Sequence, residues 1–344
     1  MKVALIGCGR IAPTHLRILK QVVPEAEVYL CDITRRQAED LGTKWRVQEI
    51  FTSLEELLSS KKPDAIHILT PPQTHAALAE KAILADCHVL VEKPVTETTG
   101  ELAKLVASAK SRKRVFAGNY STLGMPIVQR ARQQINSGDL GRLIAVHCAY
   151  SASWAGNTIP YADPAHWSYS LKGGVLRNWA DHPASLVVSV LDSVEEHKTM
   201  VAHRNALPFN SPDLLHVVVK NRDQIGSFTL SLGHGNTDIR AHFLLEGGFI
   251  TIDLRRMLFS IVRMKGQQKM IQRALSGILE GSSLISGTLS NVLGMITKKL
   301  QREPGIFHVI NNFYKAIDLK EDLLIPDRLM LTITGLLEEV WKEV

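Results

Sequence analysis

The sequence predicts an α/β protein whose amino-terminal part is a parallel sheet covered by helices. Short apolar runs alternate with helix-like stretches over residues 2 to about 120, and a glycine-rich turn follows the first run. The length of 344 residues is enough for two domains, and 45% apolar with 22% charged residues is ordinary for a globular protein. This composition excludes disordered chains, collagen and coiled-coil rods.

Five short apolar runs, each bounded by glycine, proline or charged residues, are expected to be strands buried on both faces. They are residues 3–6, 28–30, 65–69, 88–91 and 115–117. Four stretches with apolar residues near helical spacing lie between them, at residues 11–21, 35–42, 74–84 and 97–110. Because strand and helix alternate along the chain, the strands are expected to run parallel, with helices covering the sheet.

The positive charge of the chain is confined to one segment. The formal net charge is +6, but residues 254–303 carry nine basic and two acidic residues, so the rest of the chain is close to neutral. A protein that binds nucleic acid is expected to be basic over a wider surface, so no nucleic-acid partner is predicted. An anionic partner is to be sought at this segment alone.

The cysteines and the amino terminus favour a protein of the reducing cytoplasm. Four cysteines lie far apart without a Cys-x-x-Cys pair: Cys8, Cys31, Cys87 and Cys148. Neither disulfides nor a metal site is therefore expected. The first apolar run is interrupted by Gly7 and Gly9, so it is not a secretory signal. The motifs of serine hydrolases, zinc proteases and P-loop nucleotide hydrolases are also lacking in the sequence.

The turn after the first strand has the spacing of a dinucleotide-binding loop. Gly7-Cys8-Gly9-Arg10-Ile11-Ala12 follows the strand directly and opens a helix. Gly7 permits the tight turn, Gly9 lets the backbone approach a pyrophosphate, and Ala12 lets the helix pack closely on the strand. The helix N-terminus attracts the negative charge of the phosphates. We therefore expect Gly7, Gly9, Arg10 and Ile11 to bind a coenzyme.

Asp32 ends the second strand 25 residues after Gly7, which is near the position of the acid that binds a ribose 2′-hydroxyl. Its carboxylate would repel a 2′-phosphate, and this favours NAD as the cofactor. Arg36, with Arg35 beside it, is expected near the coenzyme and could instead hold that phosphate, so NADP stays open as an alternative. A second alternative is that Asp32 only caps the next helix while both arginines lie in solvent.

Two further motifs follow the next strands. Thr70-Pro71-Pro72-Gln73-Thr74-His75 comes after the run at 65–69, and Glu92-Lys93-Pro94 comes after the run at 88–91. In order and spacing these motifs, with the glycine turn, resemble the Gfo/Idh/MocA family of glucose-fructose oxidoreductases and inositol dehydrogenases. The resemblance implies an NAD(P)-binding Rossmann domain over residues 1–121. It also implies a substrate and oligomerisation domain over residues 122–344, whose last helix packs back on the Rossmann domain.

The resemblance gives further expectations for both domains. The second domain would be built on a large, mainly antiparallel open sheet that covers the nicotinamide and pairs subunits into a dimer or tetramer. Six residues of the first domain would line the coenzyme: Thr70, Pro71, Pro72, His75, Glu92 and Lys93. Among them His75 is more simply explained as a helix-start residue than as a catalyst. A cis Pro94 would aim Lys93 into the cleft, where a partly desolvated lysine exchanges a proton with a substrate hydroxyl.

The stretch after Gly173-Gly174 carries the other expected catalytic residues. His182 lies in register with the family histidine, and Asn178 occupies the position of the family aspartate. Four residues are about one helical turn, so both side chains share a face. Asparagine cannot accept a proton as a carboxylate does, so Asn178 would orient the substrate while Lys93 and His182 handle the proton. We expect Lys93 and His182 to converge beside C4 of the bound nicotinamide.

Residues suited to binding sugars surround this stretch, since aromatic faces stack on sugars and polar groups bind their hydroxyls. The expected substrate contacts are Asn119, Tyr120, Trp154, Tyr161, Trp167, Asn178 and His182. Any one of these aromatic residues could instead belong to the core. The loop at 119–122 lacks the arginine that the family tends to carry there, so it does not indicate which substrate binds.

Four more strands and two closing helices are expected in the second half. The strands are residues 214–219, 227–232, 241–245 and 249–253, and the helices are residues 307–317 and 327–344. Between them, residues of about 263–303 look like an addition to the family pattern. Residues 271–300 carry apolar side chains at three- to four-residue steps between basic flanks. Packing of this stripe against the sheet or another subunit is favoured, and weak contact with a membrane surface is the alternative.

These observations predict an NAD-dependent oxidoreductase that transfers hydride between nicotinamide and a hydroxyl or ketone of a sugar, cyclitol or nucleotide-sugar. Two alternatives remain: an imine or enamine reductase of the same family, and an NAD-binding regulator or scaffold without catalysis. The protein is expected in the cytoplasm, where the added segment would place it against the inner face of the membrane if it binds lipid.

Overall fold

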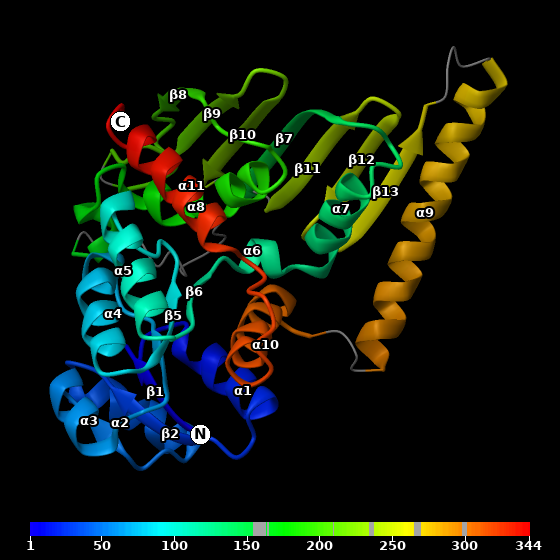
Figure 1. Cartoon of the computed structure of the whole chain (residues 1–344). Coiled ribbons are helices and arrows are strands. Elements are labelled where there is room, and N and C mark those ends of the chain that lie inside the picture. Colours follow the sequence, from blue (N-terminus) through cyan, green and yellow to red (C-terminus); the bar gives the residue numbers. More distant parts are fainter. Residues whose placement is uncertain (154–162, 164, 209, 234–236, 265–269, 298–300) are drawn as a thin grey trace. The chain divides into compact units, whose positions relative to one another are not determined.

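The computed structural model describes residues 1–344 except 154–162, 164, 209, 234–236, 265–269 and 298–300 (Figure 1). The chain forms two compact units. Unit 1 comprises Met1–Ser121 and Gly305–Glu338, and unit 2 comprises Thr122–Pro304 and Glu339–Val344. The chain therefore returns to unit 1 near its carboxyl end.

Unit 1 contains a six-stranded sheet in which every neighbouring pair of strands is parallel. Its strands are β1 (Lys2–Ile6), β2 (Glu27–Cys31), β3 (Ile50–Phe51), β4 (Ala65–Ile68), β5 (His88–Glu92) and β6 (Phe116–Asn119). Their order is β3-β2-β1-β4-β5-β6. The order reverses between β1 and β4, and open sheets of this kind bind ligands at the carboxyl ends of the strands beside that point. The predicted parallel sheet is confirmed.

Helices follow the strands of unit 1. They are α1 (Ala12–Val22), α2 (Arg35–Trp45), α3 (Leu54–Lys61), α4 (His75–Leu84) and α5 (Thr99–Ser111), and the short α6 (Ser121–Gly124) leads out of the unit. Strand β3 and helix α3 lay outside the predicted elements, because β3 has only two residues and presents no apolar run. A capping box between Thr98 and Glu101 fixes the start of α5.

The carboxyl-terminal helices α10 (Pro304–Asp318) and α11 (Asp327–Val340) bring most of their residues into unit 1. Phe313 and Tyr314 of α10 are buried, as are Met330 and Ile333 of α11. The Glu338 carboxylate accepts hydrogen bonds from the backbone N–H and the hydroxyl of Thr99, each at 2.8 Å. The core of this unit is therefore completed by the end of the chain.

Unit 2 is built on a seven-stranded sheet. Its strands are β7 (Leu143–Ala152), β8 (Glu196–Ala202), β9 (Leu214–Lys220), β10 (Ile225–Leu232), β11 (Asp238–Leu245), β12 (Gly248–Asp253) and β13 (Leu258–Arg263). Their order is β13-β12-β11-β7-β10-β9-β8, and only the β7–β10 pair is parallel. The prediction of a mainly antiparallel sheet is confirmed.

Helices α7 (Pro126–Asn136) and α8 (Gly174–Val188) pack on one face of this sheet. Strand β10 shows the alternation, because Phe228 and Leu230 are fully buried whereas Ser227 and Thr229 are half-exposed on the opposite face. Helix α9 (Met270–Ile296) stands beside the edge strand β13 (Figure 1). Its apolar residues were expected to pack on the sheet or on another subunit. Packing on the sheet is wrong for most of the described ones, because they are exposed to solvent, and packing on another subunit stays a prediction.

Candidate functional site

The glycine turn of unit 1 has the backbone conformation that its sequence requires. Gly7 has φ +94°, and a Cβ at this residue would lie 2.9 Å from the carbonyl carbon of Leu69. Any larger residue would therefore push β1 and the end of β4 apart. A Cβ at Gly9 would meet no atom within 4 Å, so the backbone here faces open space. That is the space in which a pyrophosphate approaches the turn in a dinucleotide-binding domain.

Asp32 fastens this turn to the next one. One carboxylate oxygen accepts a hydrogen bond from the Cys8 backbone N–H at 2.7 Å, and the other accepts from the Thr34 N–H at 2.8 Å. The side chains of Arg35 and Arg36 are 69% and 88% exposed and lie in ion pairs with acids one turn further along α2. The residues present fit NAD, since the carboxylate of Asp32 beside the glycine turn would repel a 2′-phosphate and Arg36 is ion-paired with Asp40.

His75 joins the two loops that carry the remaining motifs of unit 1. Its ring nitrogens lie 2.7 Å from the carbonyl oxygens of Pro94 and Thr70, and the side chain is fully buried at the start of α4. His75 therefore holds the loop after β4 against the turn after β5. The Lys93–Pro94 peptide bond is cis, as the family resemblance implied. Lys93 itself is half-buried.

A chain of buried polar side chains runs from Glu92 into the core of unit 1. His15 Nε2 lies 3.0 Å from the Glu92 carboxylate, and His15 Nδ1 lies 3.0 Å from His67 Nδ1. His67 Nε2 in turn lies 2.9 Å from the Tyr314 hydroxyl. Both histidines are fully buried, and Tyr314 is nearly so. The Asn119 amide, also buried, donates a second hydrogen bond to Glu92.

One placement of protons satisfies every contact in this chain with two neutral rings. Burial raises the pKa of Tyr314 well above its usual value, so its hydroxyl donates to His67 Nε2. Burial lowers the pKa of His67, so this ring is neutral and donates from Nδ1 to His15. His15 then donates from Nε2 to Glu92. All three donors point toward the carboxylate.

Glu92 is ionised at the end of this chain. Burial opposes its ionisation, but the hydrogen bond from His15, the Lys93 cation and the hydrogen bond from Asn119 together hold the pKa of Glu92 below its usual value. The second carboxylate oxygen accepts a hydrogen bond from the Lys93 backbone N–H at 3.2 Å. The buried hydrogen-bond chain thus fixes the Glu92 carboxylate, which in turn holds the backbone of Lys93.

In unit 2, α8 carries Asn178 and His182, and both are half-buried. His182 Nδ1 lies 3.0 Å from the Thr122 hydroxyl, and its ring stacks on Tyr150 at a centroid distance of 5.6 Å and an interplanar angle of 10°. Trp179 lies 5.7 Å from the same ring. The His182 ring is therefore held in one orientation by a hydroxyl and two aromatic neighbours.

The other expected substrate residues have different surroundings. Trp154 and Tyr161 lie outside the described residues. Trp167 is half-buried in a short 3-10 helix (Trp167–Ser170). Asn119 and Tyr120 are 1% and 2% exposed, so neither side chain is presented to solvent, and Asn119 is hydrogen-bonded to Glu92. That bond uses the amide nitrogen of Asn119, whereas its Oδ1 has no hydrogen-bond partner among the described residues.

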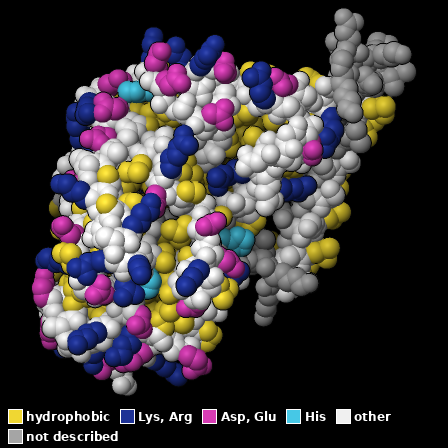
Figure 2. Space-filling view, in the orientation of Figure 1, with side chains coloured by type: hydrophobic (Ala, Val, Ile, Leu, Met, Phe, Trp, Pro, Cys, Tyr) yellow, Lys and Arg dark blue, Asp and Glu magenta, His cyan; other side chains and the backbone are white. Residues whose placement is uncertain are grey.

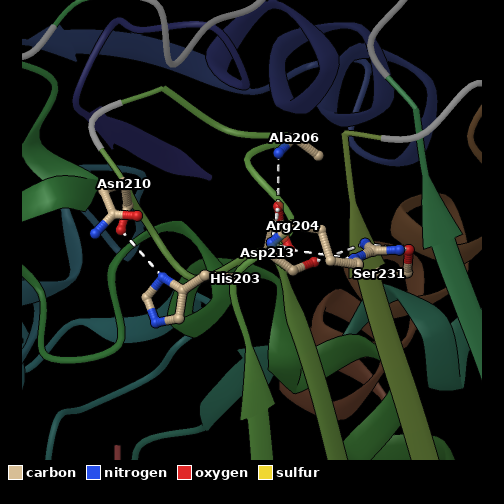
Figure 3. A network of polar contacts seen from close by, with 6 residues as sticks. All are labelled: His203, Arg204, Ala206, Asn210, Asp213 and Ser231. Atoms are coloured by element: carbon tan, nitrogen blue, oxygen red, sulfur yellow. Dashed lines mark hydrogen bonds and ion pairs between the residues drawn. The ribbon is translucent and has the colours of Figure 1, made fainter.

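A polar cluster in unit 2 braces the segment before β9 (Figure 3). The fully buried Asp213 accepts hydrogen bonds from the backbone N–H groups of Arg204 and Ala206, and its carboxylate lies 3.2 Å from Arg204 Nε. His203 Nδ1 donates to the Asn210 carbonyl oxygen. His203 also lines a pocket of about 540 Å³ at the start of α8, beside Gly173 and Gly174.

Two family profiles match this chain. The one described as an oxidoreductase family with an NAD-binding Rossmann fold matches residues 1–120, and the one described as a Gfo/Idh/MocA carboxyl-terminal domain matches residues 128–251. Together they cover more than half of the chain. Unit 1 is accordingly an NAD-binding Rossmann domain.

Among similar characterised proteins is a dTDP-3,4-didehydro-2,6-dideoxy-alpha-D-glucose 3-reductase from Saccharopolyspora spinosa, which is 27% identical over 54% of each chain. A UDP-N-acetylglucosamine 3-dehydrogenase from Acidithiobacillus ferrooxidans is 32% identical over 39% of this chain and 41% of its own length. The chain thus spans about half the length of these relatives.

A solved structure with the same fold is the WlbA dehydrogenase of Bordetella pertussis, in complex with NADH and UDP-GlcNAcA. It has a TM-score of 0.78 at 19% identity and covers 99% of this chain and 94% of its own. With the parallel sheet, the glycine turn and both matching profiles established, the chain belongs to the Gfo/Idh/MocA family of oxidoreductases.

Proposed function

We propose that this protein is an NAD-dependent oxidoreductase whose substrate is a ring hydroxyl, or the matching ketone, of a nucleotide-linked sugar. The observation that carries the proposal is the position of Lys93. It follows β5 directly, at the same edge of the sheet as the glycine turn after β1, and β4 alone separates these two strands. A proton-exchanging group and a dinucleotide turn therefore share the edge where open parallel sheets bind ligands.

In the proposed mechanism Lys93 takes the proton from the substrate hydroxyl during oxidation and returns it to the ketone during reduction. Bound NAD supplies the acceptor, or as NADH the donor, of the hydride. Glu92 and its buried partners hold the Lys93 backbone in place. The ammonium group therefore moves only by rotation about the bonds of the Lys93 side chain. His182 would assist by a hydrogen bond to the substrate, and Asn178 would orient a hydroxyl or carbonyl. The convergence of Lys93 and His182 on one substrate carbon is part of this proposal.

The substrate class is supported by the names of the two relatives, which act on dTDP- and UDP-linked sugars at position 3. The test is turnover of UDP- and dTDP-hexoses, free inositols and cyclic imines, followed by NADH absorbance. We expect the nucleotide-linked hexoses to be turned over with the highest kcat/KM. Turnover of imines alone would favour the reductase alternative, and NAD binding without turnover of any compound would favour the non-catalytic one.

Replacing Asp32 with asparagine is expected to reduce the preference for NADH over NADPH. A hydrogen bond to a charged group contributes about 1.5 to 3 kcal/mol, so kcat/KM with NADH should fall roughly 10-fold or more. Removal of the negative charge should at the same time raise kcat/KM with NADPH. Steady-state kinetics with both coenzymes measures the ratio, and Glu80→Gln on the exposed side of α4 serves as the control. An unchanged ratio would show that Asp32 only braces the turn.

Pairing of subunits through the half-exposed face of the unit 2 sheet is also proposed. That face carries hydrogen-bonded histidine and hydroxyl pairs across neighbouring strands, including His147 with Ser227 and His216 with Thr229. Light scattering after size-exclusion chromatography would give the mass. A monomer at micromolar concentration would refute this assembly, and the proposed location in the cytoplasm is independent of it.

A further inference from the structure

Helix α9 presents its polar and small residues to the sheet. The Glu280 carboxylate lies 3.4 Å from the Ser260 hydroxyl of β13, and Gly287 packs against the side chain of Leu258. The Asn291 amide donates hydrogen bonds to the carbonyl oxygens of Arg256 and Met257, at 2.8 and 3.2 Å. Hydrogen bonds and a glycine contact therefore hold this side of the helix to β13 and the turn before it.

The opposite side of α9 is apolar and open to solvent. Its exposed residues are Leu275, Ile278, Ile285, Leu289, Val292, Leu293 and Ile296, which are between 47% and 72% exposed. Figure 2 shows hydrophobic side chains along the outer edge of the helix. A monomeric protein rarely exposes so many large apolar side chains side by side, so this face is built to contact something other than water.

Three hydroxyl groups of α9 are already bonded within the helix. The hydroxyls of Ser286, Thr288 and Thr297 donate to the carbonyl oxygens of residues one turn earlier. Entry of this side into an apolar medium would therefore leave these hydroxyls satisfied, which removes most of the cost of burying them.

The charges of the segment indicate what that medium is. Between Ala274 and Thr297 the sequence has one charged residue, Glu280, and its side chain faces β13. Basic residues precede and follow this span in the sequence: Lys265, Lys269 and Arg273, then Lys298, Lys299 and Arg302. In the sequence these flanks carry more basic than acidic residues, although Arg302 is ion-paired with Glu303. An anionic lipid surface therefore complements this span better than a second copy of the same basic sequence does.

We propose that the outward side of α9 docks on the surface of an anionic lipid bilayer, with the helix axis lying along the membrane plane. From Leu275 to Ile296 the apolar side extends about 32 Å at 1.5 Å per residue. No helix in the described part of the chain is long and apolar enough to cross a bilayer. The protein would therefore lie against the membrane by this one helix, and this inference does not depend on the proposed substrate.

Vesicle flotation of the full-length protein tests the proposal. Wild type is expected to float with vesicles of phosphatidylcholine and phosphatidylglycerol at 7:3, and much less with phosphatidylcholine alone or in 0.5 M NaCl, which screens the charges. The double variant Ile285→Glu/Leu289→Glu should bind the anionic vesicles at least about 10-fold more weakly, because two side chains lose their apolar burial. Leu319→Glu, which places the same charge at an exposed leucine after α10, should float as wild type does.

Three results would overturn the proposal. In the first, wild type does not float with the anionic vesicles. In the second, the double variant floats as well as wild type does. In the third, wild type binds no lipid, and light scattering gives the double variant a lower molecular mass than wild type. The last result would identify a second copy of the chain as the occupant. Circular dichroism and the rate of NADH turnover in solution verify that the double variant is folded. If the double variant fails to fold, the single variant Ile296→Glu is tested in its place.

Discussion

Replacing Lys93 with methionine is expected to lower kcat/KM by roughly 10²- to 10⁴-fold, the range that a positioned proton-exchanging group contributes. Methionine preserves most of the length of the side chain but carries no exchangeable proton. The backbone of residue 93 remains fastened to Glu92 in the variant, because that hydrogen bond uses the main-chain N–H. Binding of NADH, measured by its fluorescence, should therefore change little while turnover collapses.

The matched control for this variant is Lys104→Met, at an exposed lysine of α5 in the same unit. It removes the same charge from the surface and should leave kcat/KM unaltered. If Lys93→Met retained more than a tenth of the wild-type kcat/KM, Lys93 would not be the group that exchanges the proton. The mechanism would then have to be assigned to unit 2.

Replacing Glu92 with leucine should destabilise the protein by about 3 kcal/mol or more at pH 7. The variant leaves the buried donors of His15 and Asn119 without an acceptor, and each unsatisfied buried donor typically costs about 1 to 3 kcal/mol. Because the pKa of Glu92 is lowered in the folded state, its contribution is fully present above the unfolded value of 4.5. It is lost as the pH falls through the lower folded pKa, so the difference between wild type and variant should shrink in acid.

Urea unfolding between pH 7 and pH 3 measures this difference. A double-mutant cycle with His15→Gln isolates the contact between the two side chains, and we expect a coupling of about 1 to 3 kcal/mol at pH 7. A pH-independent difference, or no coupling, would mean that the carboxylate is not the end point of the buried hydrogen-bond chain.

The sequence was informative where function depends on short stretches of chain. The glycine turn, Asp32 and the Glu92-Lys93-Pro94 turn each reside in a few consecutive residues, so their spacing predicts their place at strand ends. His75 joins the carbonyl oxygens of Thr70 and of Pro94, the residue after Lys93, so the two loops lie side by side. Their chemical roles remain proposals.

The buried chain behind Glu92 could not have been predicted from spacing. His15, His67 and Tyr314 come from α1, β4 and α10, and the last two are separated by 247 positions. The only local signal was a histidine within an apolar strand, at residue 67. A lone histidine there does not reveal its partners, because tertiary packing alone selects them.

The orientation of α9 was missed for a different physical reason. Its apolar stripe predicted a helix correctly, but amphipathic helices usually turn such a stripe toward the core. Here Glu280 and Asn291 form hydrogen bonds with β13 and the backbone before it, and Gly287 allows close approach. These partners become visible only once β13 is placed, and that strand was not predicted.

The inclusion of Gly305–Glu338 in unit 1 affects the order in which the protein can mature during synthesis. A nascent chain of only the first 121 residues lacks Phe313 and Tyr314. His67 then has no tyrosine hydroxyl as a hydrogen-bond partner, and the apolar surface of unit 1 that α10 covers stays exposed to water. The interior of unit 1 therefore cannot close before residues 305–338 have been translated. Removal of residues 305–344 is expected to weaken NAD binding, although every glycine, aspartate and lysine of the binding loops would still be present.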